Sequence, residues 1–212
     1  MKTPPEFNEA TATPEELWDY CLREYNSRNP AVRHLLRRFF KVIGRVLTTL
    51  DRGDRVLEVG CGAGESSRRI LALLQGQHYE ISEYDPRYVE MLRRTDFPIQ
   101  VTQESVYELQ RRDGEFDCIL MLEVLEHLTD YRRALREVFR VSRKHVIISV
   151  PNEPLWSLLN ILRGQYVRDL GNTPGHVNRW GPRAIRRLIE EYGVCRRVYT
   201  PVPWIVVHAQ RR

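Results

Sequence analysis

Apolar residues recur along this chain at two spacings, and the two spacings alternate. Between residues 31 and 50 they follow a helical period, with basic side chains at 33, 37, 41 and 45 beside the apolar stripe. After residue 55, short apolar runs alternate with further helical patterns. We predict strands over 56–59, 78–83, 99–102, 116–122, 145–150, 194–200 and 205–208, and helices from residue 65 and over 86–94, 131–141 and 182–192.

Strands that alternate with helices indicate an α/β fold with a mostly parallel, seven-stranded sheet and helices on both faces. We expect residues 1–50 to form an N-terminal helical extension and residues 51–212 to form one domain. Within that domain, residues from about 152 to 180, irregular as far as 174, are predicted to form a lid or insertion on the substrate side. Aromatic residues outside the strands would either cover a small molecule or pack the N-terminal helices: Trp18, Tyr20, Tyr25, Trp156, Tyr166 and Trp180.

Composition places the chain among globular proteins, because 42% of its 212 residues are hydrophobic and 29% are charged. No apolar run approaches the roughly 18 residues that a membrane span needs, and the first thirteen residues lack an apolar signal-peptide core. The cysteines are scattered, which fits reduced thiols and a cytoplasmic location. The net charge of +5 is concentrated after residue 163, where the basic excess either steers a phosphorylated or nucleic-acid substrate or forms a solvated face.

The segment from Val56 to Glu65 carries the most specific pattern. An apolar strand containing Glu58 runs into glycines at 60, 62 and 64 and then into a helix. Glycines allow a sharp turn and a close approach of a ligand to the backbone. A dinucleotide fingerprint would need a third glycine where Glu65 stands, so an NAD-dependent dehydrogenase is disfavoured. A carboxylate at Glu58 also suits an ammonium group better than a pyrophosphate.

The string Glu58-x-Gly60-x-Gly62-x-Gly64 resembles motif I of the class I S-adenosylmethionine (SAM)-dependent methyltransferases. Further features follow in the family's order. They are Glu83 at the end of the second strand, the pair Glu104-Ser105 after the third, the string F-D-x-I-x-x-x-E-V-L-E-H-L from Phe116, and Val-Pro-Asn at 150–152. The resemblance covers roughly residues 50–152. It implies a Rossmann-like fold and methyl transfer from SAM, which leaves S-adenosylhomocysteine (SAH).

The resemblance also implies which residues bind the cofactor. Glu83 would accept hydrogen bonds from the ribose hydroxyls, while Asp85, the alternative, is better suited to capping the next helix. Glu104 and Ser105 would recognise the adenine. The implied cofactor-binding residues are Glu58, Gly60, Cys61, Gly62, Gly64, Glu83, Tyr84, Glu104, Ser105, Met121 and Leu122.

A second candidate site lies in Glu123-x-x-Glu126-His127, because residues i, i+3 and i+4 of one helical turn share a face. These side chains could hold a hard divalent cation such as Mg²⁺. A similar set binds metal in ubiquinone-biosynthesis O-methyltransferases and small-RNA 2′-O-methyltransferases, and the comparison with their downstream loop makes His176 the fourth candidate ligand. The metal would lower the pKa of a substrate hydroxyl. Without a metal, Glu126 and His127 would line the pocket as catalytic or structural groups.

The leading functional hypothesis is methyl transfer from SAM to a small molecule, at an oxygen nucleophile. A second hypothesis takes RNA as the acceptor, which the basic C-terminal region favours and the lack of an appended RNA-binding module disfavours. A third is a SAM-binding protein without catalysis.

Overall fold

The structure, a computed structural model, describes residues 12–25, 27–162, 164, 169–173 and 175–212. Within these residues, seven strands form one sheet in the order β3-β2-β1-β4-β5-β7-β6. Neighbouring strands from β1 to β5 are parallel, whereas β7 is antiparallel to both β5 and β6. The strands are β1 (Arg55–Val59), β2 (His78–Glu83), β3 (Val101–Gln103), β4 (Phe116–Leu122), β5 (Ser142–Pro151), β6 (Gly193–Tyr199) and β7 (Trp204–Arg211). The predicted mostly parallel, seven-stranded sheet is confirmed.

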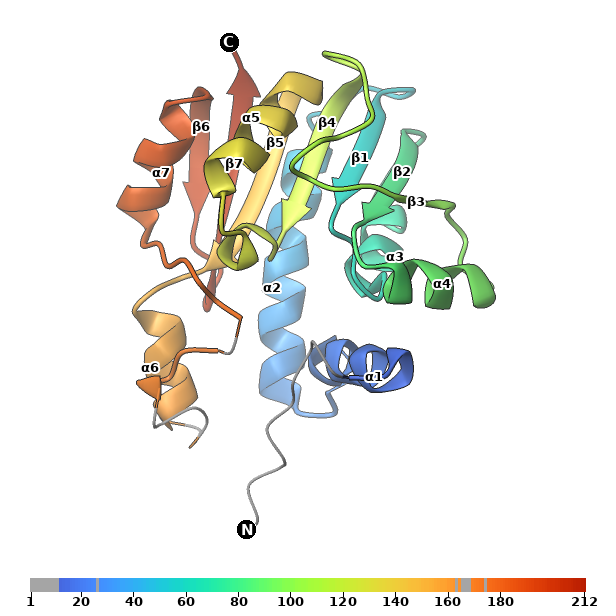
Figure 1. Cartoon of the computed structure of the whole chain (residues 1–212). Coiled ribbons are helices and arrows are strands. Elements are labelled where there is room, and N and C mark those ends of the chain that lie inside the picture. The colour runs from blue at the N-terminus through green and yellow to red at the C-terminus, as the bar shows by residue number, and fades with distance from the viewer. Residues whose placement is uncertain (1–11, 26, 163, 165–168, 174) are drawn as a thin grey trace.

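Helices cover both faces of the sheet, as predicted (Figure 1). On one face, α5 and α7 pack against the strands through Leu135, Val138 and Ile185. On the other face, α2 and α3 pack through Phe39 and Ile43 of α2 and Ile70 of α3. The helices are α1 (Pro14–Tyr25), α2 (Pro30–Leu47), α3 (Glu65–Leu71), α4 (Pro86–Arg94), α5 (Tyr131–Val141), α6 (Leu155–Leu162) and α7 (Pro182–Glu190), with a 3₁₀ turn, η1, at Leu125–His127.

Local sequence signals explain where two of these helices begin. The side chain of Asn29 accepts a hydrogen bond from the N–H of Ala31 at 2.9 Å, and Pro30 occupies the first turn of α2. At α4, Asp85 accepts from the N–H of Arg87 at 2.8 Å. Asp85 is therefore a helix cap, the role that the sequence favours for it over binding ribose.

The helix α6 corrects the prediction that the chain is irregular from residue 152 to 174. Its sequence, LWSLLNIL, carries no charged side chain and only two polar ones. A helix that is apolar on most sides has no amphipathic period, so the periodicity test does not detect it.

The order of the strands determines which edge of the sheet carries the candidate site. From β1 the chain passes outward to β2 and β3 and then returns to β4 on the other side of β1. In sheets of this kind, ligands bind beyond the carboxyl ends of the strands where the strand order reverses. That edge is the lower end of the sheet in Figure 1, where α1 and α6 lie to either side of the first turns of α2. None of the helices in the described part of the chain has the length and apolar character to cross a membrane.

Candidate functional site

The turn after β1 is built on three glycines with left-handed backbone, at φ 73° for Gly60, 52° for Gly62 and 76° for Gly64. A Cβ at Gly60 would lie 2.6 Å from Cγ2 of Val124, and a Cβ at Gly64 would lie 2.6 Å from the ring of Phe97. A Cβ at Gly62 would have no atom of the described residues within 4 Å. Two glycines are therefore needed for packing, whereas Gly62 faces open space that a ligand can enter.

Glu83 lies directly beside that open space. Its Oε2 accepts a hydrogen bond from the N–H of Gly62 at 2.8 Å, and its Oε1 accepts from the N–H groups of Tyr84 and Asp85 at 2.6 and 2.9 Å. Burial raises the pKa of Glu83. The next side chain, Tyr84, is 70% exposed. This end of β2 therefore presents a fixed carboxylate and an exposed aromatic ring at the glycine turn.

The carboxylate of Glu58 is buried and forms hydrogen bonds within the fold, so its expected contact with an ammonium group stays a prediction. Only 1% of the residue is exposed. Its carboxylate accepts hydrogen bonds from the hydroxyls of Ser66 and Ser67, at 2.7 and 2.6 Å, and from the hydroxyl of Tyr79. Glu58 therefore supports the glycine turn and the first turn of α3 from behind.

The side chain of Glu104 is also engaged within the fold. Its carboxylate receives the guanidinium of Arg111 at 2.8 and 3.0 Å and the N–H of Gln110 at 3.2 Å. The hydroxyl of Ser105 accepts from the N–H of Tyr107 at 3.2 Å. Both side chains hold the loop after β3 in this structure.

The remaining predicted cofactor residues are buried in the core. Cys61 is 5% exposed, Met121 0% and Leu122 7%. The N–H of Cys61 donates to the carbonyl of Ser82 at 3.1 Å. Burial also raises the pKa of the Cys61 thiol. The side chains of these residues belong to the hydrophobic core, and the Cys61 thiol is not poised to react.

The loop after β4 carries the second candidate site, and Glu123 lies at the start of this loop. Glu123 has φ 55°, and its N–H donates to the carbonyl and the hydroxyl of Ser149 at 3.2 and 3.0 Å. The Ser149 hydroxyl in turn donates to Oε1 of Glu123 at 2.7 Å. The 3₁₀ turn begins only at Leu125. The expected single helical turn that carries three ligands is not formed, because Glu123 has positive φ and lies outside the 3₁₀ turn that holds Glu126 and His127.

Glu126, His127 and His176 do come together, as predicted. One potential ligand atom from each lies within 4.8 Å of the others. Glu126 is 1% exposed, and neither of its oxygens has a hydrogen-bond partner among the described residues. Burial and the nearby charge of Glu123 raise the pKa of Glu126 well above its ordinary value. A buried carboxylate without partners requires a proton or a cation.

The downstream loop reaches the cluster through backbone hydrogen bonds. The N–H groups of Val177 and Asn178 donate to the carbonyl of Glu126 at 3.0 and 3.1 Å. The rings of His127 and His176 meet edge to face at 4.9 Å, and Nδ1 of His127 lies 3.2 Å from the carbonyl of Gly175. Desolvation and the neighbouring imidazole lower the pKa of His176 to about 4, so this ring is neutral at pH 7.

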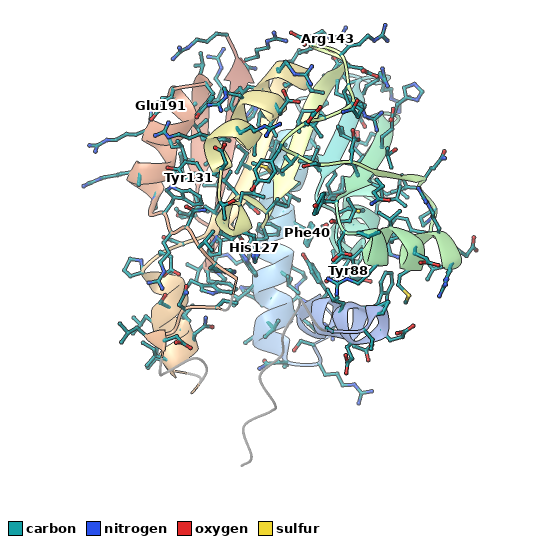
Figure 2. All side chains as sticks on the ribbon, in the orientation of Figure 1. Phe40, Tyr88, His127, Tyr131, Arg143 and Glu191 are labelled. Carbon is teal, nitrogen blue, oxygen red and sulfur yellow. The ribbon has the colours of Figure 1, made fainter. Side chains whose placement is uncertain are left out.

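The cluster opens to solvent at the carboxyl end of the sheet. Glu126 is buried, His176 is half-buried and His127 is exposed. Figure 2 shows His127 below the ends of the central strands. A substrate group that approaches His127 from solvent therefore meets the imidazoles first and the carboxylate last.

The predicted lid aromatics that the structure describes act mainly in packing. The ring of Trp156 lies 6.3 Å from that of His176 and 6.2 Å from that of Trp204. Trp180 packs edge to face on Tyr131 at 5.4 Å, and Trp18 contacts the apolar cluster under α4. Tyr166 and the side chain of Tyr20 lie outside the described parts.

Sequence reasoning missed the groups that support the candidate site. Ser66, Ser67 and Tyr79 satisfy Glu58, and Ser149 fixes Glu123. The only local signal was a pair of serines at the start of a helix, which offers hydroxyl donors near the preceding strand.

Comparison with known proteins agrees with this geometry. The family model of the methyltransferase domain matches residues 31–194. A probable SAM-dependent methyltransferase of Mycobacterium tuberculosis is 33% identical over 104 residues, which cover 48% of this chain and 37% of that protein. A ubiquinone biosynthesis O-methyltransferase of Methylocella silvestris is 31% identical over 107 residues, covering 47% of this chain and 41% of that protein. The matches therefore span less than half the length of these two relatives.

Solved structures agree on the fold. The magnesium protoporphyrin IX methyltransferase of Synechocystis, solved with bound SAH, superimposes with a TM-score of 0.64 at 16% identity. The superposition covers 92% of this chain and 94% of that one. The chain carries motif I, its strand order reverses between β1 and β4, and the family model matches most of its length. This chain therefore belongs to the class I SAM-dependent methyltransferase family.

Proposed function

We propose that this protein transfers the methyl group of SAM to an oxygen atom of a small-molecule acceptor. The observation that carries the proposal is the contact between the two loops. The open space at Gly62 would hold the donor, and the same turn packs through Gly60 onto Val124, at the start of the loop that bears Glu126 and His127. The O-methyltransferase relative supports an oxygen acceptor.

In this proposal, the cofactor rests on the glycine turn. The backbone of Gly60, Gly62 and Gly64 provides the surface, Glu83 accepts from the ribose hydroxyls and Tyr84 flanks the bound molecule. Glu58 and Glu104 contribute indirectly, because their carboxylates hold α3 and the loop after β3. Cys61, Met121 and Leu122 would support this surface from the hydrophobic core.

The cluster of Glu126, His127 and His176 would supply a base and orient the acceptor. The acceptor oxygen forms a bond to the methyl carbon as the bond between that carbon and the sulfonium sulfur breaks, which leaves neutral SAH. The hydroxyl proton passes to an imidazole of the cluster, and exposed His127 is the candidate base. His176, with its pKa lowered to about 4, is the weaker base of the two candidates for this step. The enzyme's main contribution is to align the two reactants and exclude water.

The cluster also fits a divalent cation held by Glu126, His127 and His176. Both oxygens of Glu126 are buried and have no hydrogen-bond partner in the described part of the chain, which is the observation that favours a cation. One carboxylate and two imidazoles suit a borderline transition-metal ion better than the Mg²⁺ that the sequence suggests. When bound, such an ion would lower the pKa of the acceptor hydroxyl.

The test measures SAM binding by calorimetry and SAH formation in the presence of either a small-molecule extract or total RNA. We expect each chain to bind one SAM molecule. We also expect SAH to form with the small-molecule extract, at a rate that falls when a chelator is added and recovers when Mn²⁺ or Zn²⁺ is restored. SAH formation with RNA alone would instead favour an RNA acceptor. Tight SAM binding with no turnover on either material would favour a protein that binds SAM without catalysis. Glu83→Ala, which should lose SAM binding, is the control for the donor site.

A further inference from the structure

A cavity of about 390 Å³ lies where α1, α2 and α3 meet, outside the methyl-transfer site described above. Arg33 and Arg37 line it from the first turns of α2, Arg28 from the connection before α2, and Arg69 from α3. Tyr25, at the end of α1, forms another part of the wall. In Figure 1 this junction lies at the lower end of α2, below the sheet.

No carboxylate among the described residues neutralises the arginines of this cavity. Elsewhere, Arg111 pairs with Glu104 at 2.8 Å and Arg55 pairs with Glu80 at 2.9 Å. Among the described residues, none of the four cavity arginines forms an ion pair with a carboxylate, and no acidic side chain lines the cavity. Arg28, Arg33 and Arg37 are exposed and Arg69 is half-buried. Four guanidinium groups around one cavity give it a positive potential, which attracts an anion.

Arg69 supplies a second, independent observation. One of its terminal nitrogens donates to the carbonyl of Tyr25 at 3.4 Å, and its guanidinium lies over the rings of Tyr25 and Phe40, 5.4 Å from each centroid. Its Nε is buried and has no hydrogen-bond partner among the described residues. The side chain of Arg69 is thus held in place in the cavity wall by Tyr25 and Phe40, which fixes the position of its charge.

We infer that this cavity binds a phosphorylated small molecule, either a phosphomonoester or a diphosphate. A phosphomonoester carries about two negative charges and three acceptor oxygens at neutral pH, and arginine binds such groups through paired N–H donors. A carboxylate offers one charge and two oxygens, which is a poorer match to four guanidiniums. The ring of Tyr25 and the side chain of Leu36 provide an apolar wall for the organic part of the ligand.

This inference is independent of the proposed function, because SAM carries no phosphate and none of these residues lies at the glycine turn. SAM affinity therefore serves as a check that each variant folds. A response to the phosphorylated compound is read separately from methyl transfer.

The experiment compares two double variants of α2 that remove the same charge. Arg33→Ala/Arg37→Ala removes two cavity arginines, and Arg38→Ala/Arg45→Ala removes two exposed arginines of the same helix that do not line the cavity. Calorimetry at physiological salt measures the affinities for pyrophosphate, phenyl phosphate and citrate. We expect the phosphates to bind at least about tenfold more tightly than citrate, the first variant to weaken them at least about tenfold, and the second to change them less than about twofold.

Equal weakening in both variants would show diffuse attraction to a basic helix and would overturn the inference. Absence of phosphate binding, or equal affinity for citrate, would overturn it as well. A further arm measures cosedimentation with phosphatidylcholine vesicles that contain phosphatidic acid. Vesicle binding that soluble phenyl phosphate displaces is expected if a lipid headgroup enters the same cavity. If the soluble compounds do not bind in calorimetry and phenyl phosphate does not displace the vesicles, the basic face is a flat membrane-binding surface. That result would overturn the inference that the cavity binds a phosphorylated molecule.

Discussion

The glycine turn after β1 and the loop after β4 contact each other, but they differ in how the buried carboxylates beside them are hydrogen-bonded. At the glycine turn, Glu58 accepts hydrogen bonds from three hydroxyls and Glu83 accepts from three backbone N–H groups. After β4, Glu126 is equally buried but its oxygens have no partner among the described residues. A buried carboxylate whose oxygens accept hydrogen bonds stabilises the fold. A buried carboxylate without hydrogen-bond partners is available to bind a proton, a cation or a substrate.

The largest effect should come from Glu126→Gln. We expect at least a hundredfold loss of methyl transfer, about 2.7 kcal/mol of transition-state stabilisation, with SAM affinity unchanged. An amide can neither bind a cation as a carboxylate does nor take up a proton. Steady-state SAH formation and calorimetry measure the two quantities. Glu123→Gln, which keeps an acceptor for Ser149, is the matched control and should lose far less. Full activity in Glu126→Gln would mean that this carboxyl group is only structural.

Stability should show the reverse order. Glu58→Gln should lower the free energy of unfolding by about 2 kcal/mol, because it disturbs hydrogen bonds to two serine hydroxyls and one tyrosine hydroxyl. Glu126→Gln should either raise the free energy of unfolding or lower it by no more than about 0.5 kcal/mol. The reason is that the Glu126 side chain has no hydrogen bond to lose among the described residues. Urea titrations of both variants measure the difference. Equal losses would remove the distinction between the two carboxylates.

The open face of the glycine turn can be tested with a matched pair of substitutions. Gly62 and Gly53 both have positive φ, at 52° and 85°, and a Cβ at either would have no described atom within 4 Å. Alanine should therefore cost similar backbone strain at the two positions. We expect Gly62→Ala to weaken SAM binding about tenfold, roughly 1.4 kcal/mol, and Gly53→Ala to leave it unchanged. Identical affinities would mean that SAM does not approach Gly62.

How far the sequence predicts each region depends on where the partners of a residue lie. The strands were predictable because their apolar runs are local, and the glycine turn was predictable because its backbone demands are local as well. The side-chain direction of Glu58 was not, since Tyr79 reaches it from the neighbouring strand β2. The ion pair of Glu104 was not predictable for the same reason, because Arg111 lies beyond a loop. Glu123 was placed on a helical turn because nothing in the sequence signals its positive φ.

The smallest effect concerns a polar pair away from both loops, and it shows where acid sensitivity should arise. Nδ1 of His145 lies 2.9 Å from Nε2 of His208, and both residues are 8% exposed. Burial and the neighbouring imidazole lower the pKa of His208 to about 4, and burial also lowers that of His145. Between pH 6.5 and 4, the unfolded chain therefore binds protons that the folded chain does not, so this contribution to stability is lost as the pH falls through that window.

His208→Gln keeps a hydrogen-bonding group but removes one of the two titrating rings. When the pH falls from 6.5 to 5, the free energy of unfolding should fall by roughly 1 kcal/mol less in the variant than in the unsubstituted protein. Urea titrations at the two pH values measure this change, and His34→Gln on the exposed face of α2 is the control. If the difference between variant and unsubstituted protein is the same at both pH values, acid sensitivity has another source. The unsatisfied carboxylate of Glu126 does not supply it, because a raised carboxyl pKa makes the fold bind protons more readily than the unfolded chain and so favours the fold at lower pH.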